Sequence, residues 1–171
     1  MNNKYLIIFI SLFLFSNIQS QVNPNAIGVR GGGFLGSYGG EISYQKGFGE
    51  ANRLELDLGW RSRRYNNGNG NGNNWYYNQF SVTGIYHWVF NITDGLNWYI
   101  GPGAQLGFYD DYYGINSGVS LAVGGQIGLE YDFNVHDVPL LLSLDARPMF
   151  DFIGYYRGIG GGGAFSLRYT F

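Results

Sequence analysis

The chain of 171 residues contains no cysteine, only 4 prolines, and few charges for its length, 13% of all residues. The lack of cysteine excludes disulfides, thiol catalysis, cysteine-based zinc sites and a lipid anchor attached to cysteine. The net charge of -2 gives no basic surface for nucleic acid. After the first twenty residues, no apolar run is long enough for a transmembrane helix.

Glycine and aromatic residues are abundant instead, with 29 Gly, 15 Tyr and 13 Phe. Aromatic residues favour strands, and glycine marks bends and crowded positions within them. The length suits one domain. Composition therefore predicts an all-β domain.

The first twenty residues read as a targeting segment. Lys4 supplies a positive charge, and residues 5–15 form an apolar run of signal-peptide length. We expect a cleaved signal peptide over residues 1–20, ending at Ser20, although Ile18 departs from the small residue preferred before the cleavage site. The alternative is an uncleaved membrane anchor. The exported domain is then expected over residues 21–171.

Eight segments of alternating polarity follow, and alternation places the two residue sets on opposite faces of a strand. They cover residues 26–34, 40–46, 53–63, 77–91, 96–109, 119–133, 140–152 and 162–171. Connections over 47–52, 92–95 and 134–139 are short, whereas three of the four others, over 35–39, 64–75, 110–118 and 153–161, are longer. An even strand number with short turns at one end and longer loops at the other predicts an eight-stranded antiparallel up-and-down transmembrane β-barrel.

Charged residues fall on the polar face of these strands. The set is Arg30, Glu41, Glu55, Asp57, Arg61, Arg63, Glu130, Asp132, Asp145, Arg147, Asp151 and Arg168. Alternation alone does not decide which face points outward, because a soluble lipocalin-like barrel is apolar inside and a membrane barrel is apolar outside.

Glycines and aromatics favour the membrane arrangement. Glycines recur on the polar face, as a narrow lumen requires: Gly28, Gly32, Gly59, Gly101, Gly103, Gly107, Gly124 and Gly128. Large aromatics lie toward the strand ends of the apolar face, where the membrane–water interface is expected. One girdle comprises Trp88, Phe90, Trp98, Tyr131, Phe133, Tyr169 and Phe171, and the other Trp60, Phe80, Phe108, Phe150 and Phe152.

The last strand alternates from Phe165 and ends on Phe171. It resembles the closing strand of bacterial outer-membrane β-barrels, and the whole mature chain resembles the OmpA and OmpX type, most of all the Bacteroidetes outer-membrane barrel domains. The resemblance implies a monomer in the bacterial outer membrane, in contact with lipid and lipopolysaccharide. It also implies that the barrel-assembly machinery reads Tyr169 and Phe171 as an assembly signal.

The lumen charges have two interpretations, a selective pore or a packed plug of ion pairs. An eight-stranded barrel is only wide enough for side chains to fill it, and buried charges need partners, so we favour the plug. The expected lumen network comprises Arg30, Glu55, Asp57, Arg61, Glu130, Asp132, Asp145, Arg147 and Arg168.

The outer loops supply candidate contacts for an unknown partner on the cell surface. Residues 66–74 read NNGNGNGNN and precede an aromatic cluster, which either binds a partner or rests at the membrane surface. The candidate contact residues are Trp75, Tyr76, Tyr112, Tyr113, Tyr155 and Tyr156. The adjacent Asp110 and Asp111 are a weak cation signal.

Catalysis is not expected. The two histidines, His87 and His136, lie toward the periplasmic turns, away from the outer leaflet where a lipid A-modifying enzyme would act. The glycine run over 158–163 leads into a strand rather than a helix, so it lacks the features of a phosphate loop. We expect no cofactor or metal and a structural or surface-interaction role, with a small channel as the alternative and a lipid A-modifying enzyme third.

Overall fold

The computed structural model describes residue 23 and residues 25–34, 37–66, 74–111, 117–154 and 158–171. The strands are β1 (Asn25–Phe34), β2 (Ser37–Phe48), β3 (Asn52–Asn66), β4 (Asn74–Thr93), β5 (Leu96–Asp111), β6 (Ser117–Asp132), β7 (Leu140–Ile153) and β8 (Gly158–Thr170). A short 3₁₀ helix, η1 (Phe133–His136), joins β6 to β7. In this described part of the chain, no helix is long and apolar enough to cross a membrane.

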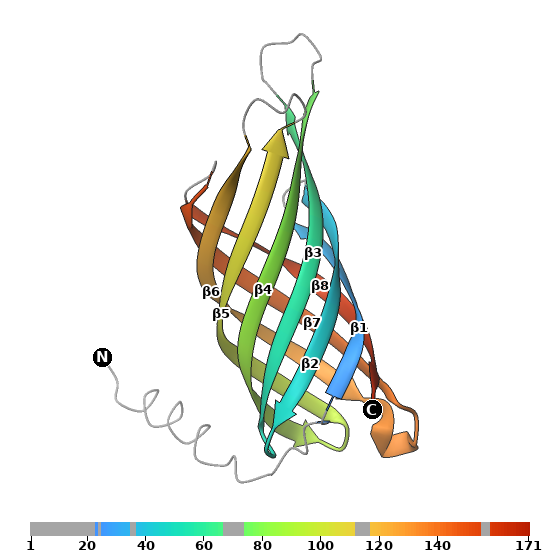
Figure 1. Cartoon of the computed structure of the whole chain (residues 1–171). Helices are drawn as coiled ribbons and strands as arrows, with labels where there is room; N and C mark the ends of the chain where they lie inside the picture. The colour runs from blue at the N-terminus through green and yellow to red at the C-terminus, as the bar shows by residue number, and fades with distance from the viewer. Residues whose placement is uncertain (1–22, 24, 35–36, 67–73, 112–116, 155–157) are drawn as a thin grey trace, which may run out of the picture.

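The strands form one closed barrel in which each strand pairs antiparallel with its neighbours in sequence (Figure 1). Closure occurs between the first and last strands, where Ala26 lies opposite Thr170 and Gly32 opposite Ala164. The predicted eight-stranded antiparallel barrel is therefore confirmed. The predicted signal peptide over residues 1–20 lies outside the described residues.

Several predicted strand limits were too short. β3 and β4 remain paired out to Asn66 and Asn74, so residues 64–66 and 74–75 of the expected loop over 64–75 belong to strands. β8 likewise begins at Gly158, inside the expected loop over 153–161. The polar–apolar alternation of the strands stops before these extensions, so alternation could not predict them. Conversely, β6 ends at Asp132, and Phe133 begins η1.

The two ends of the barrel differ. At one, which we call the turn end, residues 49–51, Asp94–Gly95 and 133–139 connect the strands, and Phe171 ends the chain. Gly49 and Gly95 have positive φ, which tight turns require, and Asp137 adopts φ 60° after η1. The remaining four connections join the strands at the other end, which we call the loop end.

The apolar face points outward. Leu144 is 64% exposed and Val29 60%, whereas Arg168, on the opposite face, is 0% exposed. The outward aromatics lie side by side, with ring centroids 4.6 Å apart for Phe90 and Trp98 and 5.1 Å apart for Phe150 and Phe152. This is the inside-out arrangement of a membrane barrel and not that of a lipocalin.

Several inward glycines are crowded, whereas two outward ones on β1 and β2 are not. A Cβ added to Gly128 would lie 2.8 Å from the Asp145 Cβ, and one added to Gly103 would lie 2.7 Å from Cγ1 of Ile85. A Cβ added to the outward Gly31 or Gly40 would meet nothing within 4 Å. The lumen therefore has no room for side chains at these inward positions.

Candidate functional site in the barrel lumen

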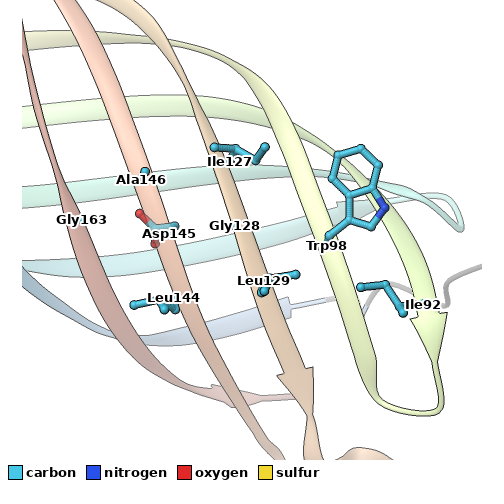
Figure 2. A pocket seen from close by; sticks show the side chains of 9 residues that line it. All are labelled: Ile92, Trp98, Ile127, Gly128, Leu129, Leu144, Asp145, Ala146 and Gly163. Atoms are coloured by element: carbon cyan, nitrogen blue, oxygen red, sulfur yellow. The ribbon is translucent and has the colours of Figure 1, made fainter. Parts of the chain in front are cut away.

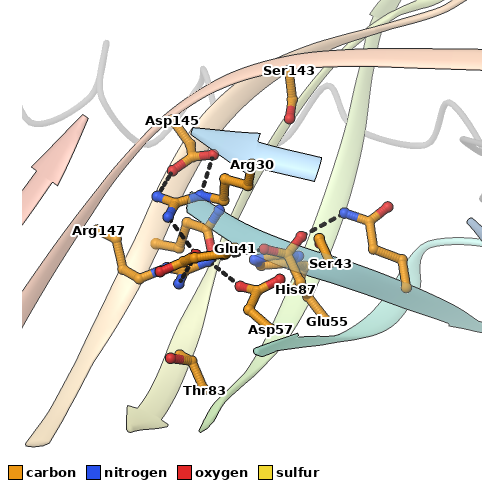
Figure 3. A network of polar contacts seen from close by, with 12 residues as sticks. Arg30, Glu41, Ser43, Glu55, Asp57, Thr83, His87, Ser143, Asp145 and Arg147 are labelled. Carbon is orange, nitrogen blue, oxygen red and sulfur yellow. Dashed lines mark hydrogen bonds and ion pairs between the residues drawn. The ribbon is translucent and has the colours of Figure 1, made fainter. Parts of the chain in front are cut away.

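Charged side chains gather in the middle of the lumen because they occupy inward positions of neighbouring strands. Glu55 and Asp57 are two residues apart on β3, and Asp145 and Arg147 are two residues apart on β7, so each pair shares a face. All four side chains are buried. Figure 3 shows them converging with Arg30 of β1.

Arg147 is the centre of this cluster. Its Nη1 lies 3.0 Å from Oε2 of Glu41, and its Nη2 lies 3.0 Å from Oε1 of Glu55. The same Nη2 contacts Oδ2 of Asp57, and Nε donates to Oε1 of Gln126 at 3.2 Å. One guanidinium therefore binds three carboxylates from two strands on the far side of the lumen (Figure 3).

Two further arginines extend the cluster. Arg30 makes a two-point contact with Asp145, with Nη2 2.5 Å from Oδ1 and Nε 3.2 Å from Oδ2. Its Nη1 lies 2.7 Å from Oε2 of Glu41. Arg168 of β8 places Nη2 3.0 Å from Oε2 of Glu55. Since Glu41 and Glu55 each bind two arginines, the charges form one connected network across the lumen.

Hydroxyl and amide groups complete the hydrogen bonding of the network. Arg168 Nε donates to Oγ of Ser43 at 3.0 Å, and Nη1 donates to Oγ of Ser143 at 2.9 Å. Gln45 Nε2 donates to Oε2 of Glu55 at 2.5 Å. Buried charges are stable only when such partners are present.

A second cluster lies closer to the turn end. Arg53 Nη2 is 2.6 Å from Oε2 of Glu130, and Arg53 Nε donates to Nδ1 of His87 at 3.3 Å. The Arg53 guanidinium also lies 4.7 Å from the ring centroid of Tyr99. The Tyr99 hydroxyl donates to Oδ2 of Asp145 at 3.3 Å and so joins the two clusters.

The sequence interpretation missed Arg53 and treated it as a strand end. Arg53 is two residues from Glu55, so the same alternation that placed Glu55 inward also places Arg53 inward. That signal was available, but it lay at the edge of the predicted segment.

The remaining charges of the polar face lie outside these two clusters. Arg61 is half-buried and interacts electrostatically with Glu41. Asp132 was wrongly grouped with the lumen network: it caps η1 at the turn end, where Oδ1 accepts from the Asn134 amide at 2.9 Å. Asp151 is half-buried on β7, and the Arg63 side chain lies outside the described residues.

β4, β5 and β6 present mainly small and uncharged groups to the lumen. Gln79 donates to Ser120 at 2.9 Å, and Gln105 donates to Thr83 at 2.9 Å. Glu130 of β6 is the buried charge described on these strands. The charged cluster therefore belongs mostly to the other five strands.

The residues of the expected assembly signal, Tyr169 and Phe171, lie at the turn end of the barrel. Tyr169 and Phe171 are exposed on the outer face with ring centroids 6.3 Å apart, and the Phe171 amide donates to the Asn25 carbonyl at 3.0 Å. Trp75 and Tyr76 lie on β4, opposite Tyr65 and Arg64, and not in a loop as expected. Tyr112, Tyr113, Tyr155 and Tyr156 lie outside the described residues.

Among the described residues, the two histidines contact tyrosine and arginine side chains. His87 is buried, with its ring centroid 4.6 Å from that of Tyr99. His136 lies in η1, with Nε2 3.0 Å from the Tyr131 hydroxyl. Over the described residues, no group of three or more histidine, aspartate or glutamate side chains is arranged to hold a metal ion.

A shallow groove of about 620 Å³ crosses the outer surface of the barrel (Figure 2). Its walls include the outward side chains of Trp98, Ile127, Leu129 and Leu144, with the small Ala146 and Gly163 between them. Because these side chains are apolar and face outward, the groove is part of the apolar belt and not an entrance to the lumen.

No protein-family model matches the chain, and no curated protein sequence matches it. Among solved structures, the crystal structure of Ail, the attachment invasion locus protein of Yersinia pestis, has a TM-score of 0.51 at 14% identity, covering 86% of this chain and 96% of Ail. The outer membrane protein Ail in a phospholipid bilayer nanodisc has a TM-score of 0.52 at 18% identity, with 88% and 100% covered. Neisserial surface protein A (NspA) has a TM-score of 0.49 at 18% identity, with 86% and 94% covered. The likeness to Ail is one of fold.

Proposed function

We propose that this protein is an integral outer-membrane β-barrel whose lumen is closed by ion pairs, with a structural or surface-interaction role. The observation that carries the proposal is the inversion of the two faces: outward residues are apolar and inward residues are charged and buried. Only a hydrocarbon environment favours such a surface, since water would penalise a continuous apolar belt. The likeness of the fold to the outer membrane protein Ail supports the same location.

A plug explains the lumen better than a pore. The two clusters and Arg61 together contain five arginines and five carboxylates: Arg30, Arg53, Arg61, Arg147 and Arg168, and Glu41, Glu55, Asp57, Glu130 and Asp145. Paired charges of both signs leave little excess field to select a passing ion. The barrel size also allows the side chains to fill the lumen.

The proposed role involves no catalysis. A lipid-modifying barrel enzyme needs a nucleophile and a base together near the outer leaflet. The two histidines lie in the lumen and at the turn end, each held by a tyrosine or an arginine.

The orientation follows from the barrel class. The turn end is assigned to the periplasm and the loop end to the cell surface. The export signal over residues 1–20, the reading of Tyr169 and Phe171 by the assembly machinery, monomeric insertion among lipid and lipopolysaccharide, and kinship with OmpA, OmpX and the Bacteroidetes barrels all form part of this proposal. Trp75, Tyr76, Tyr112, Tyr113, Tyr155 and Tyr156 are the proposed contacts with a surface partner.

Heat-modifiability tests the proposed membrane barrel. Residues 21–171 are refolded into detergent micelles, and gel mobility is compared with and without boiling. We expect a faster unboiled band together with a β-rich circular dichroism spectrum. A single unshifted band from protein that stays soluble without detergent would overturn the proposal and indicate a soluble barrel.

Planar-bilayer recording separates the plug from the channel. The refolded protein is expected to give no stable conductance steps, because the ion pairs close the lumen. Reproducible unitary steps from the unmodified protein would contradict the plug and favour the channel. Arg147→Ala serves as the comparison, since it removes the central side chain of the network.

A further inference from the structure

A polar cluster at the turn end bridges the line along which the barrel closes. It consists of Asn23, which precedes β1, Asp132 and Asn134 around the start of η1, and Thr170 at the end of β8. We propose that these four residues form a clasp that locks the seam between β1 and β8. We call them the rim clasp.

The contacts of the rim clasp join three separate segments. Asn23 Nδ2 donates to Oδ2 of Asp132 at 2.7 Å, and Asn134 Nδ2 lies 3.4 Å from Oδ1 of Asn23. Asn134 Nδ2 also lies 2.9 Å from Oγ1 of Thr170. The β6–β7 turn therefore reaches across β8 to the segment before β1, and its side chains hold both strands of the seam.

The seam needs such support more than other strand pairs do. β1 pairs with β8 only from Ala26 to Gly32, whereas β3 pairs with β4 from Asn52 to Asn66. Gly28 and Gly32 also lie at this seam and contribute no side chain to packing across it. The last backbone bond of the seam, from the Phe171 amide to the Asn25 carbonyl at 3.0 Å, lies directly beside the clasp.

The clasp also differs from an ordinary turn cap. Asp132 Oδ1 accepts from the Asn134 backbone amide at 2.9 Å, which alone would cap η1. Its second oxygen binds Asn23, which belongs to no turn and lies 109 residues away in sequence. A cap needs no such partner. The Asn23 contact therefore ties the segment before β1 to the turn beside β8. The complete rim clasp can form only after β8 has paired with β1.

Asn23→Ala tests the clasp with the least disturbance, because it removes the bridging side chain and leaves the η1 cap in place. Asn91→Ala is the matched control: Asn91 lies beside a different turn at the same end and also binds through its side chain, to Thr93 O and Asn97 Oδ1 at 3.0 Å each. Both variants are refolded into detergent. The conversion temperature of the unboiled band and the exchange rate of the Phe171 amide hydrogen are then measured.

We expect Asn23→Ala to lower the conversion temperature by about 2–4 °C. It should also speed exchange of the Phe171 amide about fivefold, since the seam opens more often. Asn91→Ala should leave the Phe171 amide unchanged. Equal Phe171 exchange in Asn23→Ala and the unmodified protein, or equal acceleration in both variants, would overturn the clasp.

A double-mutant cycle checks that the residues act as one unit. Asn134→Ala removes the contacts to both Asn23 and Thr170 and should have the larger effect on Phe171 exchange. Adding Asn23→Ala to Asn134→Ala should then cost less than Asn23→Ala alone, because one of the two Asn23 contacts is already lost and only the bond to Asp132 remains. Fully additive acceleration would show two independent turn contacts and contradict the clasp.

Discussion

The two walls of the lumen differ in what they contribute. β1, β2, β3, β7 and β8, the charged wall, carry the long paired side chains such as Arg30, Arg147 and Arg168. β4, β5 and β6, the glycine wall, contribute inward glycines such as Gly103 and Gly128 together with short polar groups. The charged wall supplies most of the buried charges, whereas the glycine wall supplies few charges and has Tyr99 as its largest buried side chain.

Inward glycines on the glycine wall make room for larger neighbouring side chains. A Cβ on Gly128 would lie 2.5 Å from Cζ of Tyr99 and 2.8 Å from Cβ of Asp145, so the glycine leaves space that those side chains occupy. Large and small inward groups on neighbouring strands interdigitate in this way at native packing density. The charged wall is stabilised by its ion pairs. The glycine wall contributes by leaving space for the side chains that pack against it.

Removing the central cation, Arg147, should destabilise the charged wall more than any other change considered. Arg147→Met keeps much of the volume but leaves Glu41, Glu55 and Asp57 with fewer cationic partners. We expect a loss of about 3–5 kcal/mol in the free energy of unfolding, because uncompensated buried charges are costly. Urea unfolding in micelles, followed by tryptophan fluorescence, measures it. If Arg147→Met does not refold, Arg147→Lys retains the charge and should give an intermediate loss. A loss below 1 kcal/mol would show that the network is solvated.

Adding volume to the glycine wall should break the packing. Gly128→Val should cost about 1–3 kcal/mol, since the surrounding side chains have to leave their rotamers. The control is Gly31→Val on the outer face of β1, where a Cβ meets nothing within 4 Å. Equal stability of the two variants in the same urea titration would show that the lumen has room for a side chain at Gly128.

The Tyr99 hydroxyl links the two walls. Removing it should lower the free energy of unfolding by a small amount. Tyr99→Phe retains the ring over Arg53 and loses the 3.3 Å hydrogen bond to Asp145. About 0.5–1.5 kcal/mol is expected for one net hydrogen bond. The midpoint of the urea transition reports it. An unchanged midpoint would show that the walls are coupled by packing and charge alone.

The faces of the strands could be predicted from the sequence, and the partners across the lumen could not. Alternation placed Glu55, Asp145 and Arg168 on one face without reference to any other strand. Pairing is different, because Arg147 meets Asp57 across 90 residues of sequence. The contact between these two side chains depends on barrel closure and on the stagger of the strands, and local sequence patterns encode neither.

The errors also have local causes. Asp132 has the inward parity of Glu130, but the chain leaves the strand there and the carboxylate caps η1. The apolar alternation of β3 stops at Trp60, so the ends of β3 and β4 beyond Arg63 were predicted to be loop. Inward Gly101 and Gly124 were recognised as crowded positions, and the structure shows the backbone and side chains that crowd them.

The strict alternation of the strands limits which insertions and deletions the chain can tolerate. One extra residue inside a strand would turn every following lumen residue toward lipid and every lipid-facing residue inward. The two register shifts in the barrel, at Asn91/Thr93 and at Leu121/Ala122, lie near strand ends. Length changes are therefore confined to the rims, where a bulge absorbs an odd residue, and the membrane-depth segments can change only by substitution.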